Sequence, residues 1–261
     1  KKSKLVNVKF TGINLQGADF SETTITNIEE YNFEQVNLKN ARFTQAVIKS
    51  IKFNGVKAQG ADFSKADLTG SFFREAQLEG TKFTGATLRK ASLEKAILTN
   101  ADFSGSILEQ ANLTQANLET ANFKSAILTQ ATLVNIHSPK ATFEKAHLQK
   151  VLMIGAVLKN ANFSGAEMEE INMKDAKLLG ASLDGAQLIS SKLQNILLHK
   201  ASMRGTNFQD ADLSSARFDD PETNIHNANF KNAIMNDAKA LEDLRLHFKD
   251  GEANISVMDF K

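Results

Sequence analysis

Histidines are the residues of this sequence best suited to acid–base chemistry or metal binding, because the imidazole ring titrates near neutral pH and ligates metals. There are five: His137, His147, His199, His226 and His247. A shared metal requires their rings to converge. His137 and His147 are separated by two repeat units, and the repeat described below places them on opposite faces of the fold. We therefore interpret the histidines as solvated surface residues, and we predict neither a metal site nor a cofactor.

Hydroxyl groups recur at fixed positions and would be nucleophiles if a histidine and an acid activated them. The recurring hydroxyls belong to Ser64, Thr69, Thr84, Thr99, Ser104 and Thr114. None has a histidine and an acid placed beside it by the repeat, and hydrogen bonding within turns explains them better. The sequence contains no Cys, which removes thiolate nucleophiles and thiolate metal ligands. We predict that the protein is not an enzyme.

Positive charge is the next candidate for chemistry, because clustered lysines bind phosphates. Lys140, Lys145 and Lys150 follow one another at a spacing of five. Each falls on a different corner of the repeat, so they form no single basic stripe. The whole chain has 31 basic and 30 acidic residues, a formal charge of +1, and this balance argues against a nucleic-acid binder. We expect no direct contact with nucleic acid.

The elements that position these residues are repeats of five residues each. Every fifth residue from Ile28 to Phe218 is Leu, Ile, Met or Phe, except Ala58 and Ser138, and the residue two positions earlier is usually Ala. On an α-helix, five residues advance about 500°, so these side chains would not share a face. In a straight strand, an odd period would point successive ones to opposite sides. The pattern instead predicts short extended pieces separated by turns.

A longer period gives the number of pieces in each coil. Phenylalanine recurs at a spacing of 20, in a predicted core ladder of Phe43, Phe63, Phe83, Phe103, Phe123, Phe143 and Phe163. A spacing of 15 gives no comparable run. Four pieces of five residues therefore make one coil, and successive coils stack so that residues one full coil apart are neighbours.

Segments such as Ala61-Asp62-Phe63-Ser64 and Ala111-Asn112-Leu113-Thr114 carry a further resemblance. They are similar to the consensus of the pentapeptide-repeat family, which is Ala, then Asp or Asn, then Leu or Phe, then two variable residues. The resemblance covers nearly the whole chain. It implies an all-β fold, the right-handed quadrilateral parallel β-helix, with backbone hydrogen bonds between coils.

The ends of the repeat region differ from its middle. We predict the β-helix over residues 1–235, with register slips near 21–30 and 219–224, and a C-terminal cap over 236–261. The cap consists of a short α-helix beginning after Asp237, followed by a strand over 255–260. Its apolar residues also make this end a candidate dimer interface; they are Leu241, Leu244 and Phe248.

Apolar residues at outward positions are the anomaly most relevant to function, because such positions should be polar. Val134 and Ile154 occupy equivalent positions in successive coils and should stack, with Leu152 and Val157 beside them. Ile107 and Ile127 form a similar pair on another face. Scattered surface apolar residues are one interpretation of both sets, and binding sites for a protein partner are the other.

Two functions are consistent with the family resemblance. The first is a non-catalytic binding module or scaffold for a protein partner. The second is a protein that binds DNA gyrase by imitating duplex DNA and thereby protects it from quinolones or similar toxins; this requires rows of carboxylates. We favour the first.

The compartment of the protein is not indicated by the sequence. No apolar run approaches the roughly 20 residues of a membrane span, so we expect a soluble protein, cytoplasmic by default. The chain begins Lys1-Lys2-Ser3-Lys4 without an initiator Met, and we expect that a preceding segment has been removed.

Overall fold

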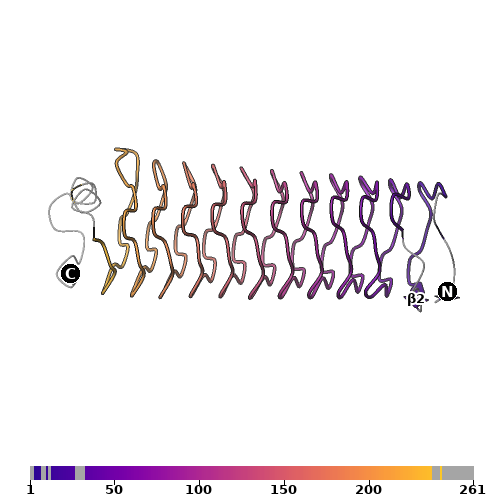
Figure 1. Ribbon diagram of the computed structural model, residues 1–261. Coiled ribbons are helices and arrows are strands. Elements are labelled where there is room, and N and C mark those ends of the chain that lie inside the picture. The colour runs from indigo at the N-terminus through magenta and orange to yellow at the C-terminus, as the bar shows by residue number, and fades with distance from the viewer. Residues whose placement is uncertain (1–2, 7–9, 11–12, 27–32, 237–241, 243–261) are drawn as a thin grey trace.

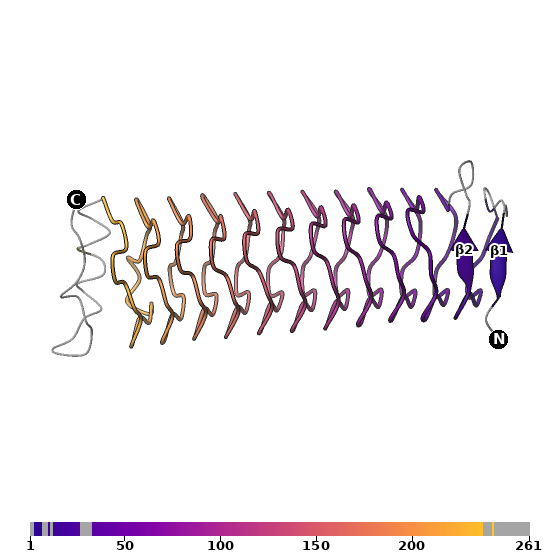
Figure 2. The same ribbon diagram turned by 90° about the horizontal axis from the view of Figure 1, so that it is seen from below.

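A computed structural model describes residues 3–6, 10, 13–26, 33–236 and 242. These residues wind into coils of similar size that stack along one axis to form a rod (Figure 1), and the view turned by 90° shows the same stack (Figure 2). The strands β1 (Lys4–Val6) and β2 (Thr24–Thr26) pair in parallel, with Leu5 opposite Ile25. Beyond β2, each extended piece contributes one parallel bridge to the coil on either side of it, as in Arg42–Asp62.

The rod has four faces, which we number by residue. Face 1 consists of residues 41–45 and the equivalent blocks of the following coils, beginning with 61–65 and 81–85. Residues 46–50, 51–55 and 56–60 begin faces 2, 3 and 4 in the same way. Bridges between equivalent residues of neighbouring coils join the coils along each face. The predicted quadrilateral β-helix is therefore confirmed.

Backbone hydrogen bonds explain why a five-residue unit suffices. The Phe43 N–H donates to the Asp62 carbonyl in the next coil at 2.7 Å, and the Asp62 N–H donates back to the Ala41 carbonyl at 2.9 Å. A third bond, from the Ala46 N–H to the Phe43 carbonyl at 3.0 Å, closes the turn at the corner. Bonds between coils and bonds at corners thus satisfy the backbone groups that burial removes from water.

The corner residue of each unit has a left-handed backbone. Gln45 has a φ of 59° and Lys145 one of 55°, as the second central residue of a type II turn requires. Ala46, the residue after Gln45, points inward again and begins the following face. The chain therefore turns after every fifth residue.

The core fills the whole interior of the rod. Ring centroids of the predicted phenylalanine ladder lie 4.7–5.3 Å apart with nearly parallel planes. A second stack, on face 3, meets this ladder edge-on near the N-terminal end, with Phe53 and Phe63 centroids 5.9 Å apart at 81°. The core ladder and the alanines of the same units are buried, so the interior has no cleft between them.

Near each end, the coils are longer than the regular four units. Asp19 pairs with Arg42 and Ser202 pairs with Asn224, where the regular repeat would place their partners at positions 39 and 222. The inward side chains keep their columns across the longer coil near the N-terminal end, as the stacking of Phe20 on Phe43 at 4.8 Å shows. The predicted C-terminal cap, with Leu241, Leu244 and Phe248, lies outside the described residues.

Candidate interaction surface

Four predicted surface residues lie on faces 3 and 4 of two successive coils, and we call them the apolar corner: Val134, Leu152, Ile154 and Val157. Leu152 is 42% exposed, and the other three are half-buried. Val134 occupies the same column as Ile154 one coil earlier, and the Asn135 N–H donates to the Ile154 carbonyl at 2.9 Å. Val134 and Ile154 thus occupy equivalent positions of neighbouring coils on face 3, with Leu152 on the same face and Val157 on face 4.

Gly155 is the corner residue between the parts of the apolar corner on face 3 and face 4. It lies between Ile154 and Val157 with a φ of +66°, and no side chain projects from this corner. A Cβ atom there would meet the side-chain oxygen of Asn135 in the preceding coil. The amide of Asn135 thus lies over the glycine.

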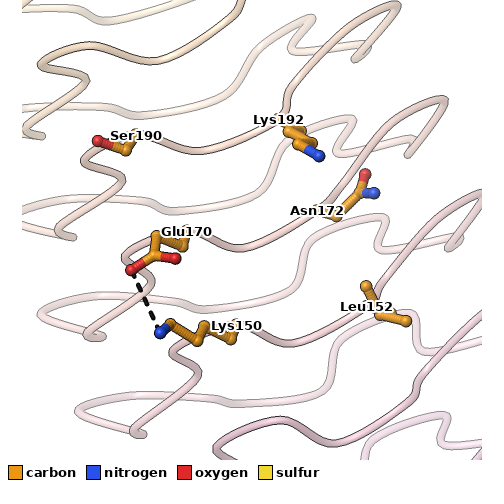
Figure 3. Close-up of a pocket in the computed structure, with 6 residues that line it drawn as sticks. All are labelled: Lys150, Leu152, Glu170, Asn172, Ser190 and Lys192. Atoms are coloured by element: carbon orange, nitrogen blue, oxygen red, sulfur yellow. Dashed lines mark ion pairs between the residues drawn. The ribbon is translucent and has the colours of Figure 1, made fainter.

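A shallow groove of about 470 Å³ runs along face 3 next to the apolar corner (Figure 3). One side is formed by Leu152, Asn172 and Lys192, one from each of three successive coils. The other side is formed by corner residues of face 2, namely Lys150, Glu170 and Ser190. The spacing of the repeat does not predict this groove, because its shape depends on the conformations of the lining side chains.

The other predicted pair, Ile107 and Ile127, lies on face 2. The two residues are directly bridged in neighbouring coils and are half-buried, with Thr87 and His147 continuing the column. Three apolar residues that the sequence did not single out are more exposed than this pair: Val47, Phe72 and Ile97. Their outward positions in the repeat could have indicated them. These three are not bridged to one another, and isolated exposed apolar residues are common on protein surfaces.

Charged residues pair mainly with the coil above or below. Lys124 Nζ lies 3.0 Å from Glu144, and Arg204 Nη2 lies 2.6 Å from Asp184. On face 1, the outward column does not form an acidic row; it reads Asp19, Arg42, Asp62, Lys82, Asp102, Asn122, Thr142, Asn162. Carboxylates along this column are therefore separated by cations or neutral groups.

Two of the four described histidines each pair with one acid. His147 Nδ1 lies 2.7 Å from Glu167, and His199 Nδ1 lies 2.6 Å from Asp219. Among the described residues, no group of three or more His, Asp or Glu side chains could hold a metal ion. Within the same residues, no helix is long and apolar enough to cross a bilayer.

Aspartates before the corners brace the turns. Burial raises the pKa of Asp102, but hydrogen bonds from Ser104, Thr84 and Asn122 outweigh it and hold the pKa below its usual value. The Ser104 N–H donates to Asp102 Oδ1 at 3.0 Å, and the Thr84 hydroxyl donates to Oδ2 at 2.8 Å. These carboxylates are engaged within the turn, so their role is structural.

The sequence profiles of two pentapeptide families match most of the chain. The profile described as "Pentapeptide repeat region" matches residues 26–103, and "Pentapeptide repeats (8 copies)" matches residues 3–28, 96–136, 140–178 and 181–220. The chain belongs to the pentapeptide-repeat family.

Solved structures of family members resemble the chain to different extents. HetL, a pentapeptide repeat protein involved in heterocyst differentiation regulation from the cyanobacterium Nostoc sp., is 29% identical; the match covers 80% of this chain and 91% of HetL, with a TM-score of 0.44. QnrB1, a plasmid-mediated fluoroquinolone resistance protein, is 15% identical over 95% of this chain and 100% of its own, with a TM-score of 0.36. A pentapeptide repeat protein from the Arabidopsis thaliana thylakoid lumen is 27% identical over 47% and 66%, with a TM-score of 0.21. No curated protein sequence matches the chain.

Proposed function

We propose that this pentapeptide-repeat protein is a non-catalytic binding module that engages a protein partner through its apolar corner. The observation that carries the proposal is the exposure of Leu152 beside three half-buried aliphatic residues of the same and the neighbouring coil, whereas exposed Phe72 and Ile97 are not bridged to another exposed apolar residue of this kind. Burial of such a cluster by a partner is favourable, at about 25 cal/mol per Å² of apolar surface. The filled interior supports a role for the outer faces, because it leaves no cleft in which reactive groups converge.

Imitation of duplex DNA, the alternative function, requires a continuous row of carboxylates. The alternation of charge on face 1 and the ion pairs between coils argue against such a row. We therefore expect that added protein leaves the quinolone sensitivity of DNA gyrase unchanged in a supercoiling assay. Protection of gyrase in that assay would reverse our preference between the two functions.

The test of the proposed function is a double substitution at the apolar corner. We expect Leu152→Glu with Ile154→Lys to reduce partner recovery at least about tenfold in a pull-down from the native source, because both charges would be desolvated on binding. Surface changes usually alter stability by less than about 0.5 kcal/mol, so the melting temperature should stay nearly constant. Phe72→Glu is the matched control, since Phe72 is 43% exposed on the same face. Unchanged recovery by the double variant would refute the proposal.

A further inference from the structure

Most of the lysines that the structure describes on faces 3 and 4 around the apolar corner form no ion pair. On faces 3 and 4, residues 131–140, 151–160, 171–180 and 191–200 contain six lysines and one acid, Asp175, a formal charge of +5; the lysines are Lys140, Lys159, Lys174, Lys177, Lys192 and Lys200. All six are exposed. Among the described residues, only Lys200 of these six forms an ion pair, with Glu222 at 3.1 Å. The amide of Asn195 already donates to Asp175 at 3.0 Å.

The same length of the rod carries the opposite charge on its other side. On faces 1 and 2, residues 141–150, 161–170, 181–190 and 201–210 contain three cations and six acids, a formal charge of −3. The net charge of +1 for the whole chain therefore conceals a separation of charge across the rod. An acidic partner would be attracted to faces 3 and 4 and repelled by faces 1 and 2.

Two adjacent columns of face 3 change from apolar or uncharged to cationic in the same direction along the rod. The column beside the groove reads Leu152, Asn172, Lys192, and the next column reads Val134, Ile154, Lys174. Figure 3 shows the first column as one side of the groove, opposite the ion pair of Lys150 with Glu170 at 3.6 Å. Because Lys150 neutralises Glu170, the unpaired charge of the groove is that of Lys192.

Lys192 is bridged to an acidic residue of the following coil, Asp212. The Asp212 carboxylate accepts hydrogen bonds from the Ser214 N–H and hydroxyl and from the Gln194 amide. Within the described part of the chain, Lys192 and Asp212 form no ion pair. The ammonium group of Lys192 is therefore available to an incoming carboxylate.

From these observations we propose that the groove and the apolar corner bind a short, extended, acidic segment of a protein partner. An aliphatic side chain of the segment packs on Leu152 and Ile154, its backbone or a polar side chain bonds the Asn172 amide, and its carboxylates face Lys174 and Lys192. Coils are about 4.8 Å apart and an extended chain rises about 3.3 Å per residue. Lys192, two coils beyond Leu152, is therefore reached after about three residues, and Lys174, one coil beyond Ile154, after about one to two.

Charge alone would also attract nucleic acid, but the surface favours a protein segment. Leu152, Ile154 and Val157 lie where a phosphate backbone would have to pass, and burying aliphatic groups against phosphates gains nothing. The described residues of these two faces between 131 and 200 include no Arg, Phe, Tyr or Trp, the residues that most often read or stack on bases. Binding of DNA is accordingly one outcome of the test.

The inference rests on the proposed function and is tested with defined peptides. Two fluorescein-labelled probes, Leu-Val-Thr-Glu-Glu and its reverse Glu-Glu-Thr-Val-Leu, are titrated by fluorescence anisotropy with blocked termini; versions with Gln for Glu and a 20-base-pair DNA duplex are the comparison probes. We expect one acidic peptide to bind at least about tenfold tighter than its Gln version, and more weakly as salt shortens the Debye length.

Substitution of the lysines shows where binding occurs. Lys174→Glu with Lys192→Glu should weaken peptide binding at least about tenfold, and the neutral changes Lys174→Gln with Lys192→Gln should weaken it less. Lys82→Glu with Lys145→Glu is the control, because these exposed lysines of face 1 also have no ion pair among the described residues. It should leave binding unchanged, and melting curves check that each variant is folded.

Three results would overturn the inference: no binding of either acidic peptide, equal binding of the Gln versions, or tighter binding of the duplex through the same lysines. Pull-down of the native partner distinguishes failure of the acidic-segment inference from failure of the proposed function. Loss of the partner with the Leu152 and Ile154 variant, but not with the Lys174 and Lys192 variant, would refute only the acidic segment. Retention of the partner in both would refute the proposed function itself.

Discussion

Individual hydroxyl groups show how the filled interior tolerates polar atoms. Ser71 is buried, yet its hydroxyl donates to the Ile48 carbonyl at 2.8 Å and accepts from the Ile51 N–H at 3.2 Å. Thr81 bonds the Ala58 carbonyl in the same way at 2.9 Å. Ser138 is also buried, but its hydroxyl has no hydrogen-bond partner. The same atom type is therefore satisfied at one inward position and not at the other.

This difference predicts opposite effects of one substitution at two sites. Ser138→Ala should stabilise the protein by up to about 1 kcal/mol, because it removes a buried and unpaired hydroxyl. Ser71→Ala should destabilise it by about 1–2 kcal/mol, because it leaves the Ile48 carbonyl and the Ile51 N–H without that partner. Urea denaturation of both variants measures the two changes, and effects of equal sign would contradict the argument.

At the scale of the five-residue element, the sequence spacing predicted the inward columns. An apolar residue that recurs every five positions, such as Phe43, can be buried only if its side chain points into the coil. The spacing also grouped the apolar corner, since equivalent residues of successive coils must stack. It could not predict the groove or the unpaired state of Lys192. Both depend on the conformations of flexible side chains such as Gln194 and Lys150 and on the partners that they bind. The repeat does not determine these conformations.

The turns themselves predict a pH effect. The pKa of Asp102 is lowered in the folded protein, so the stability that its charge contributes is present above the unfolded pKa, about 3.9, and is lost as pH falls through the lower folded value. Asp102→Asn keeps an oxygen that can accept the Ser104 N–H, as Asn112 does for Thr114 at 3.0 Å. The variant should melt below the wild type at pH 7, with a difference that shrinks below about pH 4. A difference independent of pH would contradict this assignment.

At the scale of the whole molecule, the rod is a one-dimensional stack in which each coil contacts only the coils beside it. Ring spacings of 4.8 Å from Phe103 to Phe83 and 4.7 Å to Phe123 illustrate this arrangement. In such a stack, stability is a sum of coil terms and interface terms between neighbours. The binding surface is built on the same principle, because faces 3 and 4 of four successive coils supply its apolar and cationic groups.

A substitution in the core ladder should therefore act locally along the rod. Phe103→Ala removes a ring held between two others, and a loss of about 3–5 kcal/mol is typical of such a change. Hydrogen exchange measured by mass spectrometry should show the largest loss of amide protection in residues 83–123, with smaller losses in each coil further away, because opening of one coil does not require distant coils to open. The apolar corner, which begins at Val134, should keep most of its protection and its partner. Equal loss of protection along the entire described rod would show instead that the coils unfold as one unit.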